Sequence, residues 1–216
     1  MAHGPGLGSL TGRTPDLPRP LGPPQRDLQP CRVTGLGCHA PAIVTRTTLP
    51  PIRIRAIEPG DRDALTRFYA GLSGDSLALR FHGASNGIAD RAAAVFCGPD
   101  HEHREGLVAT LDEPGASESI VVGHLCLEPA GPHEVEMAVA VADAWQRHGI
   151  GRALLVSAMA WAELHGIDRL RASMLSTNVA ILGLLRSLER PVALTMPGAG
   201  VVEATIDIAR VLRPAA

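Results

Sequence analysis

A strand, a short loop and a long helix follow one another between residues 134 and 165 of this chain. The stretch Glu134–Val141 can place alternate side chains on opposite faces, as a strand does. Residues 149–165 are apolar nearly all round, so we expect a helix sandwiched against a sheet. Gly166, a residue that accepts positive φ, should end that helix. A strand followed by a helix that packs on the sheet restricts the chain to folds that combine helices with a sheet.

The rest of the chain continues this alternation of strands and helices. Pro59-Gly60 should turn the chain, and Asp61 can cap the first helix. Residues 130–132 indicate a further turn. We predict strands at residues 52–57, 106–111, 119–127, 134–141, 169–174, 191–196 and 201–208, and helices at 62–72, 76–81, 88–96, 149–165 and 178–188. This order predicts an α/β (α+β) fold with a mixed, mostly antiparallel sheet of six to seven strands, flanked by about four helices.

The first fifty residues differ from the rest in composition. They contain nine prolines and seven glycines, which support neither regular helices nor strands. Such a segment cannot bury enough apolar surface to offset the entropy lost on ordering. We therefore expect a disordered Pro/Gly-rich leader over residues 1–51 and one folded domain over residues 52–210.

Charge and cysteine usage limit the classes of partner. The formal net charge is −2, and the acids outnumber the arginines after residue 50, so the chain lacks the basic footprint of a nucleic-acid-binding protein. No stretch approaches the roughly 18 apolar residues of a membrane span. The four cysteines form no CxxC pair, and a chain of this size needs no disulfides, which favours the reducing cytoplasm.

A metal site is not expected. Structural zinc sites have closely paired ligands, whereas the candidate cysteines and histidines of this chain are loosely spaced. The candidates weighed for a metal site are Cys97, His101, His103, His124 and Cys126.

The start of the helix at Gly149 has the features of an anion site. The first N–H groups of a helix lack internal partners, and the helix dipole adds partial positive charge there. Gly149 and Gly151 carry no side chains to keep a ligand away, and Arg147, His148 and Arg152 add donors. A diphosphate suits such a site. The dinucleotide-binding fingerprint is not met, and the phosphate-binding loop is excluded because the chain has no lysine.

The same residues resemble a known family. Gln146-x-x-Gly149-x-Gly151 matches the Q/R-x-x-G-x-G/A signature of the GNAT (Gcn5-related) N-acetyltransferases, and Asn178 is similar to the cofactor-contacting asparagine of that family. The run at 72–81 is similar to a segment of the bacterial Pat-like protein-lysine acetyltransferases. The resemblance covers about residues 52–208.

This resemblance implies an acetyl-CoA-dependent enzyme that acetylates a primary amine. Glu136 would act as the general base, and the freed amine would attack the thioester directly, with a backbone N–H near Val139 for the oxyanion. The implied cofactor-binding residues are Val139 and Val141 for the pantetheine arm, with Gln146, Arg147, His148, Gly149, Ile150, Gly151, Arg152, Ala153 and Asn178. The implied acceptor is a protein lysine.

Several alternatives stay open. Glu134 and Glu136 share a strand face with two alanines, which suits either a ligand cleft or an ordinary solvent-facing strand. Many family members have a tyrosine that protonates the leaving thiolate, but Leu185 stands at that position, and Tyr69 reads as core. The alternatives are therefore a small-molecule amine acetyltransferase, or a weakly active acyl-CoA-binding sensor. A homodimer is an open alternative to a monomer.

Overall fold

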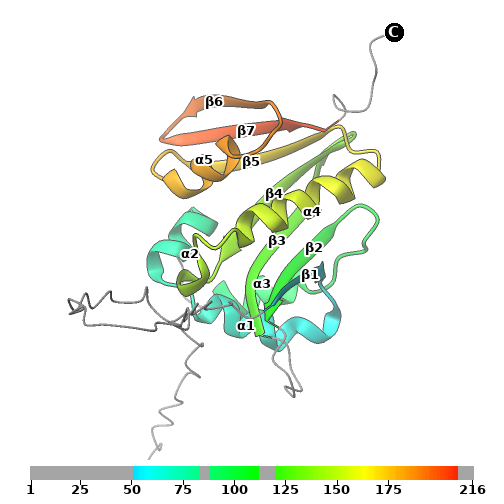
Figure 1. The fold of residues 1–216 in the computed structure, drawn as a ribbon, viewed down its shortest axis with the longest axis vertical. Helices are drawn as coiled ribbons and strands as arrows, with labels where there is room; N and C mark the ends of the chain where they lie inside the picture. The colour runs from blue at the N-terminus through cyan, green and yellow to red at the C-terminus, as the bar shows by residue number, and fades with distance from the viewer. Residues whose placement is uncertain (1–50, 83–87, 112–119, 209–216) are drawn as a thin grey trace, which may run out of the picture.

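Seven strands form one sheet in the order β1-β2-β3-β4-β5-β7-β6 (Figure 1). Neighbouring strands are antiparallel except β4 and β5, which are parallel. The strands are β1 (Ile52–Ala56), β2 (Glu105–Leu111), β3 (Ile120–Gly131), β4 (Glu134–Val141), β5 (Arg169–Leu175), β6 (Val192–Gly198) and β7 (Val201–Asp207). The mixed, mostly antiparallel sheet confirms the predicted fold class.

The computed structural model describes residues 51–82, 88–111 and 120–208. The leader predicted for residues 1–51 lies outside this part apart from residue 51, so its disorder and the domain boundary stay predictions. The helices are α1 (Arg62–Ala70), α2 (Gly74–Phe81), α3 (Ile88–Phe96), α4 (Ile150–Leu164) and α5 (Val179–Arg186).

Helices cover both faces of the sheet, as two adjacent residues of β3 show. A Cβ at Gly123 would lie 3.1 Å from side-chain atoms of both Ile150 and Leu154, so Gly123 faces α4. The next residue, His124, bonds Tyr69 of α1 on the opposite face. Successive strand residues point to opposite faces, so the sheet is the middle layer between α4 and α1. Tyr69 is fully buried, which confirms its expected place in the core.

Helix α4 is covered on one side only, which corrects the expectation of a sandwiched helix. Its buried residues, such as Leu154 and Ala158, recur at helical spacing and face the sheet. Val156 is 43% exposed and Leu164 is 84% exposed. Apolar residues on the outer side of α4 are therefore exposed, and no second layer of the described structure covers them. Gly166 follows the helix with φ of 67°, as expected.

Two local expectations need correction. The carboxylate of Asp61 does not cap α1, because it accepts hydrogen bonds of 2.6 and 2.7 Å from Arg55 and one of 2.8 Å from the backbone N–H of Glu58. The bond from Arg55 is the main reason that the pKa of Asp61 lies below its usual value. The turn expected at 130–132 lies at Pro132 and His133, because Ala130 and Gly131 still belong to β3 and its pairing with β4 continues to Glu134.

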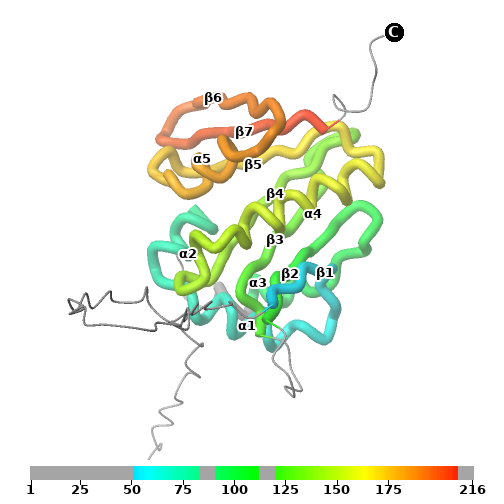
Figure 2. The backbone as a smooth tube through the Cα atoms, viewed as in Figure 1, coloured from blue at the N-terminus to red at the C-terminus, as the bar shows by residue number. Residues whose placement is uncertain are grey.

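Helix α2 and the first turns of α4 and α5 gather beside β4 and β5 (Figure 2). In the described part of the chain, no helix combines the length and the apolar character needed to cross a bilayer.

Candidate active site

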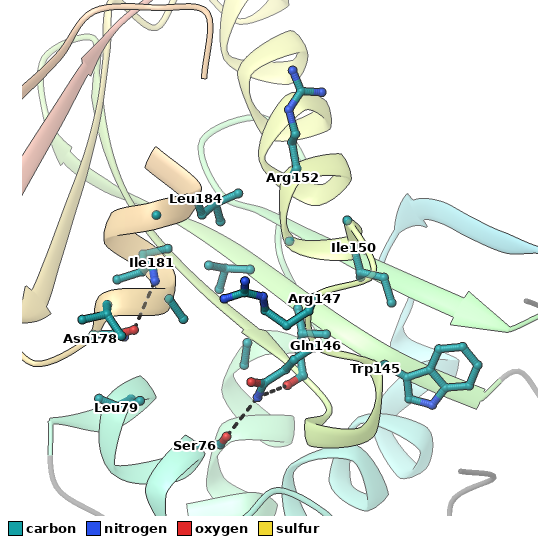
Figure 3. Close-up of a pocket in the computed structure, with 18 of the residues that line it drawn as sticks. Ser76, Leu79, Trp145, Gln146, Arg147, Ile150, Arg152, Asn178, Ile181 and Leu184 are labelled. Carbon is teal, nitrogen blue, oxygen red and sulfur yellow. Dashed lines mark hydrogen bonds between the residues drawn. The ribbon is translucent and has the colours of Figure 1, made fainter. Parts of the chain in front are cut away.

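Strands β4 and β5 separate after a short parallel ladder. The ladder pairs Glu134 with Arg169, Val135 with Leu170 and Glu136 with Arg171, and it ends there. Beyond this point a cavity of about 490 Å³ lies between β4, α2, α4 and α5 (Figure 3). Its size falls within the roughly 300–1,000 Å³ that is usual for small-molecule sites.

The start of α4 opens into this cavity without a side-chain cap. Gly149 precedes the helix with φ of 82°, a conformation that suits glycine, and no side chain of the described residues bonds the first N–H groups. Gly149, Ile150 and Gly151 line the cavity. The positive end of the helix dipole therefore faces a space that a ligand can enter.

Two arginines border this helix start. Arg147 extends over the cavity towards α5, whereas the side chain of Arg152 extends along α4 away from the cavity centre (Figure 3). Arg152 also lies 3.8 Å from the exposed carboxylate of Glu189. Arg147 thus adds positive charge at the cavity, and Arg152 adds it at the rim.

The loop between β4 and α4 is fastened to α2 by Asp143. This carboxylate accepts 2.9 and 2.8 Å bonds from the backbone and hydroxyl of Ser73, and a 2.7 Å bond from the hydroxyl of Ser76. Burial by itself raises the pKa of Asp143, but these bonds outweigh it and the pKa lies below its usual value. Asp143 is thus held ionised as the link between α2 and the loop.

Gln146 completes the same link. Its amide nitrogen donates to the hydroxyl of Ser76 and to the carbonyl of Val141, each at 3.2 Å (Figure 3). Gln146 lines the cavity, but these bonds commit its side-chain donor to the protein. Its side chain therefore positions the loop.

The backbone of β4 beyond the ladder faces the cavity. The carbonyl of Val141 is directed away from β3, since it accepts from Gln146. Alternation along the strand directs the backbone of Val139 to the same side, where β5 no longer pairs. Val139 thus offers a strand edge inside the cavity.

Asn178 lies across the cavity from β4. Its side-chain oxygen accepts a 3.2 Å bond from the N–H of Ile181 and caps α5 (Figure 3). Both residues also line a second cavity of about 50 Å³. This smaller cavity lies between Met137–Val139 of β4 and Ala172–Met174 of β5.

The two acids of β4 have different surroundings. Glu134 contacts Arg169 at 3.1 Å and Arg171 at 3.2 Å, so it is part of an ion-pair network. Glu136 is exposed and has no hydrogen bond or ion pair within the described residues. It borders neither cavity, but it shares a strand face with Ala138, which lines the smaller one.

The histidines and cysteines weighed for a metal do not gather into a site. Within residues 51–82, 88–111 and 120–208, no group of three or more His, Cys, Asp or Glu residues could hold a metal ion. His124 is instead buried and bonded to Tyr69, and His101 bonds Glu105.

Comparison with known proteins places this site in a family. The model of the acetyltransferase (GNAT) family matches residues 79–188, about half of the chain. The chain belongs to this family. As a GNAT protein it is an acetyl-CoA-dependent N-acetyltransferase.

Solved structures support the GNAT fold. The GNAT domain of PAT from S. lividans is 25% identical, with a TM-score of 0.64 over 72% of this chain and 90% of that one. The protein yncA of Salmonella typhimurium, solved with acetyl-CoA, is 22% identical, with a TM-score of 0.57 over 76% and 98%. A phosphinothricin acetyltransferase of Sinorhizobium meliloti, also with AcCoA, is 18% identical, with a TM-score of 0.55 over 72% and 86%.

Most of the residues expected to bind the GNAT cofactor lie together. The large cavity is lined by Val139, Val141, Gln146, Arg147, Gly149, Ile150, Gly151, Arg152 and Asn178. His148 and Ala153 do not line it. The ring of His148 bonds the carbonyl of Gln146, and Ala153 lies on the exposed side of α4.

Helix α2 also contributes to the cavity, a role that the resemblance of residues 72–81 did not predict. Ser76, Leu79 and Arg80 line the cavity from this helix. One signal was present in the sequence, because Arg80 interrupts an apolar run at the end of α2. Only the packing of α2 over β4 and β5 brings this residue to the site.

Proposed function

We propose that the large cavity holds acetyl-CoA, that Glu136 is the general base, and that the acceptor is a lysine side chain of a protein. In this assignment the cofactor diphosphate lies at the start of α4. The amine approaches from the sheet face that carries Glu136.

The start of α4 supports the position of the diphosphate. Uncapped N–H groups, the helix dipole and Arg147 together favour a doubly charged group. Gly151 supports it further, because a Cβ there would lie 3.4 Å from Leu184 and 3.9 Å from Val141, which both line the cavity, so a larger side chain would extend into it.

The edge of β4 supports the course of the pantetheine arm. An extended chain with amide groups can bond to an unpaired strand edge, as added strands do. Val139 offers such an edge between the large and the small cavity, and it lines both. The small cavity of about 50 Å³ then suits a short acyl group.

The surroundings of Glu136 support its role as base. An exposed carboxylate without a partner is free to accept a proton, whereas Glu134 is held by two arginines. Glu136 is two residues from Ala138, about 7 Å along a strand, so proton transfer would pass through a water molecule.

The openness of this face supports a protein acceptor. In the described part of the chain, neither cavity encloses Glu136, so a small amine would find few contacts there. A lysine side chain is long enough to reach inwards from a protein that rests on the surface. The similarity to the GNAT domain of S. lividans PAT and the segment at 72–81 favour the Pat-like group.

The single observation that carries the proposal is the uncapped start of α4 facing a cavity that continues to the strand of Glu136.

The test is release of CoA thiol from acetyl-CoA with a panel of proteins and of small amines, followed by mass spectrometry of the acetylated product. We expect lysine acetylation of a protein. Faster turnover of a polyamine, amino acid or aminoglycoside would overturn the acceptor, and binding of acetyl-CoA without release would overturn the catalytic role of Glu136.

A further inference from the structure

Arg80 lies where the two cavities meet. Five residues line both cavities: Leu79, Arg80, Val139, Asn178 and Ile181. Arg80 is the one charged side chain among them. If pantetheine fills the larger cavity and the acyl group fills the smaller one, the thioester lies at this junction.

The guanidinium of Arg80 is held in place by neutral groups, and it also interacts with the buried hydroxyl of Tyr69. Its centre lies 4.7 Å from the ring of Phe81 and 5.3 Å from the ring of Phe96, and Nη2 lies 3.2 Å from the sulfur of Cys126. Burial raises the pKa of the Cys126 thiol, so this sulfur is not a counter-ion. Stacking on two rings fixes the direction of the guanidinium.

Among the residues that the structure describes, no carboxylate neutralises this arginine. Within the described residues Arg80 forms no ion pair, and its buried Nε–H has no hydrogen-bond partner. A part-buried charge without a partner is unfavourable, and a buried donor without an acceptor adds to the cost. Such a cation is suited to an anion that forms only during the reaction.

Helix α5, which lines the cavity opposite β4, carries no side chain that could protonate the leaving thiolate. Leu185 is 2% exposed and apolar. Tyr69 lines neither cavity, and its hydroxyl is bonded to His124 inside the core at 2.8 Å. The negative charge that leaves with sulfur therefore needs another stabilising group.

We propose that Arg80 is a catalytic residue that stabilises the negative charge developing on the thioester, first on the carbonyl oxygen and then on the departing sulfur. This inference rests on the proposed position of acetyl-CoA. Fixed charges that face a developing anion in a site shielded from water are among the strongest sources of catalysis.

The step balances without an added reagent. Glu136 takes one proton from the acceptor ammonium, and the amine then attacks the thioester carbon, so that the C–N bond forms and the carbonyl pair moves to oxygen. The carbonyl re-forms as the C–S bond breaks, and the electron pair leaves on the CoA thiolate. The second amine proton passes to water, and water protonates the thiolate. Arg80 transfers no proton.

The test titrates the thiol of bound CoA, which needs no acceptor. Ultraviolet absorbance of the thiolate is followed against pH in the complex of CoA with the wild type, with Arg80→Met and with Arg80→Lys. We expect the wild type to lower the pKa of the bound thiol by about one unit or more relative to free CoA. Arg80→Met should abolish this shift, and Arg80→Lys should keep most of it.

Turnover provides a second measurement. Arg80→Met should lower kcat about 100-fold, while the KM for acetyl-CoA changes little, because the interaction is made mainly in the transition state. Thermal melting checks that each variant is folded. An unchanged thiol titration in folded Arg80→Met would overturn the role of Arg80 and leave the cofactor site intact. Failure of the wild type to bind CoA would overturn both proposals.

Discussion

The hydroxyl of Ser76 donates a 2.7 Å hydrogen bond to the carboxylate of Asp143, across 67 residues of sequence. This bond and the two from Ser73 join α2, which carries Arg80, to the loop that precedes α4. These hydrogen bonds therefore hold the two sides of the candidate cofactor site together. Neither Ser76 nor Asp143 belongs to the signature around Gly149.

Asp143→Asn should weaken the attachment of α2 to the loop that precedes α4. An amide has only one acceptor oxygen and no charge, so we expect a loss of about 1–3 kcal/mol in the free energy of unfolding and weaker binding of acetyl-CoA. Urea denaturation and calorimetry measure the two effects. Asp75→Asn, an exposed carboxylate on the same helix, is the control and should change both by much less. Equal effects of the two substitutions would remove Asp143 from the site.

Gly151→Glu should abolish binding of acetyl-CoA while the chain stays folded. The new side chain would project into the cavity at the helix start and place a negative charge where we expect the diphosphate. Calorimetry measures the binding of acetyl-CoA, and circular dichroism checks that the variant is folded. Ala153→Glu adds the same charge on the exposed side of α4 and should bind normally. Unchanged affinity in Gly151→Glu would show that the diphosphate lies elsewhere.

Glu136→Gln should keep cofactor affinity and lower turnover about 100-fold, the usual loss for a general base. Glu134→Gln is a matched control on the same face of β4, and it should retain turnover because its carboxylate serves an ion-pair network. Steady-state kinetics with the identified acceptor measures both. Full activity of Glu136→Gln would assign the base to another group.

Gly123→Ala should destabilise the fold from the centre of the sheet. The added Cβ would lie 3.1 Å from side-chain atoms of Ile150 and Leu154 and 3.3 Å from Ala109, so the side chains between the sheet and α4 must shift to make room. We expect a cost of about 1–3 kcal/mol by urea denaturation and a weaker site, since Ile150 begins α4. Gly98→Ala, with open space around it, is the control. A neutral effect of Gly123→Ala would mean that this contact is adaptable.

His124 should make the protein sensitive to mild acid. Burial, and to a lesser extent Arg80, lower the pKa of His124 from 6.5 to about 3. Below pH 6.5 the unfolded chain therefore binds a proton that the folded chain does not, so stability falls as the pH falls towards 3. Between pH 7.5 and 5.0 this effect is worth about 2 kcal/mol.

Urea denaturation of the wild type and of His124→Asn at these two pH values measures the effect. The variant lacks the titrating ring, so its stability should change less between pH 7.5 and 5.0, even if it is lower at both. The carboxylates with lowered pKa values, Asp61, Asp100 and Asp143, act nearer pH 4 or below and contribute little in this window. Equal slopes for the two proteins would contradict the assignment.

The elements of this fold and the start of α4 could be predicted because they depend on neighbours in sequence. The strand Glu134–Val141 follows from alternation, and the end of α4 before Gly166 follows from the positive φ that glycine adopts readily. The bounds of most strands and helices agree with the structure to within a few residues for the same reason. Local pattern, however, overestimated how fully α4 is covered.

Only the tertiary structure decided which side chains share the site. Arg80 lines the two cavities because α2 packs against β4 and β5. The same packing brings Ser73 and Ser76 within hydrogen-bonding distance of Asp143. The opening between β4 and β5 depends on where their pairing stops, after Glu136. Such contacts join segments far apart in the chain, so they follow from the packing of whole elements, and the local sequence does not specify the partner of either residue.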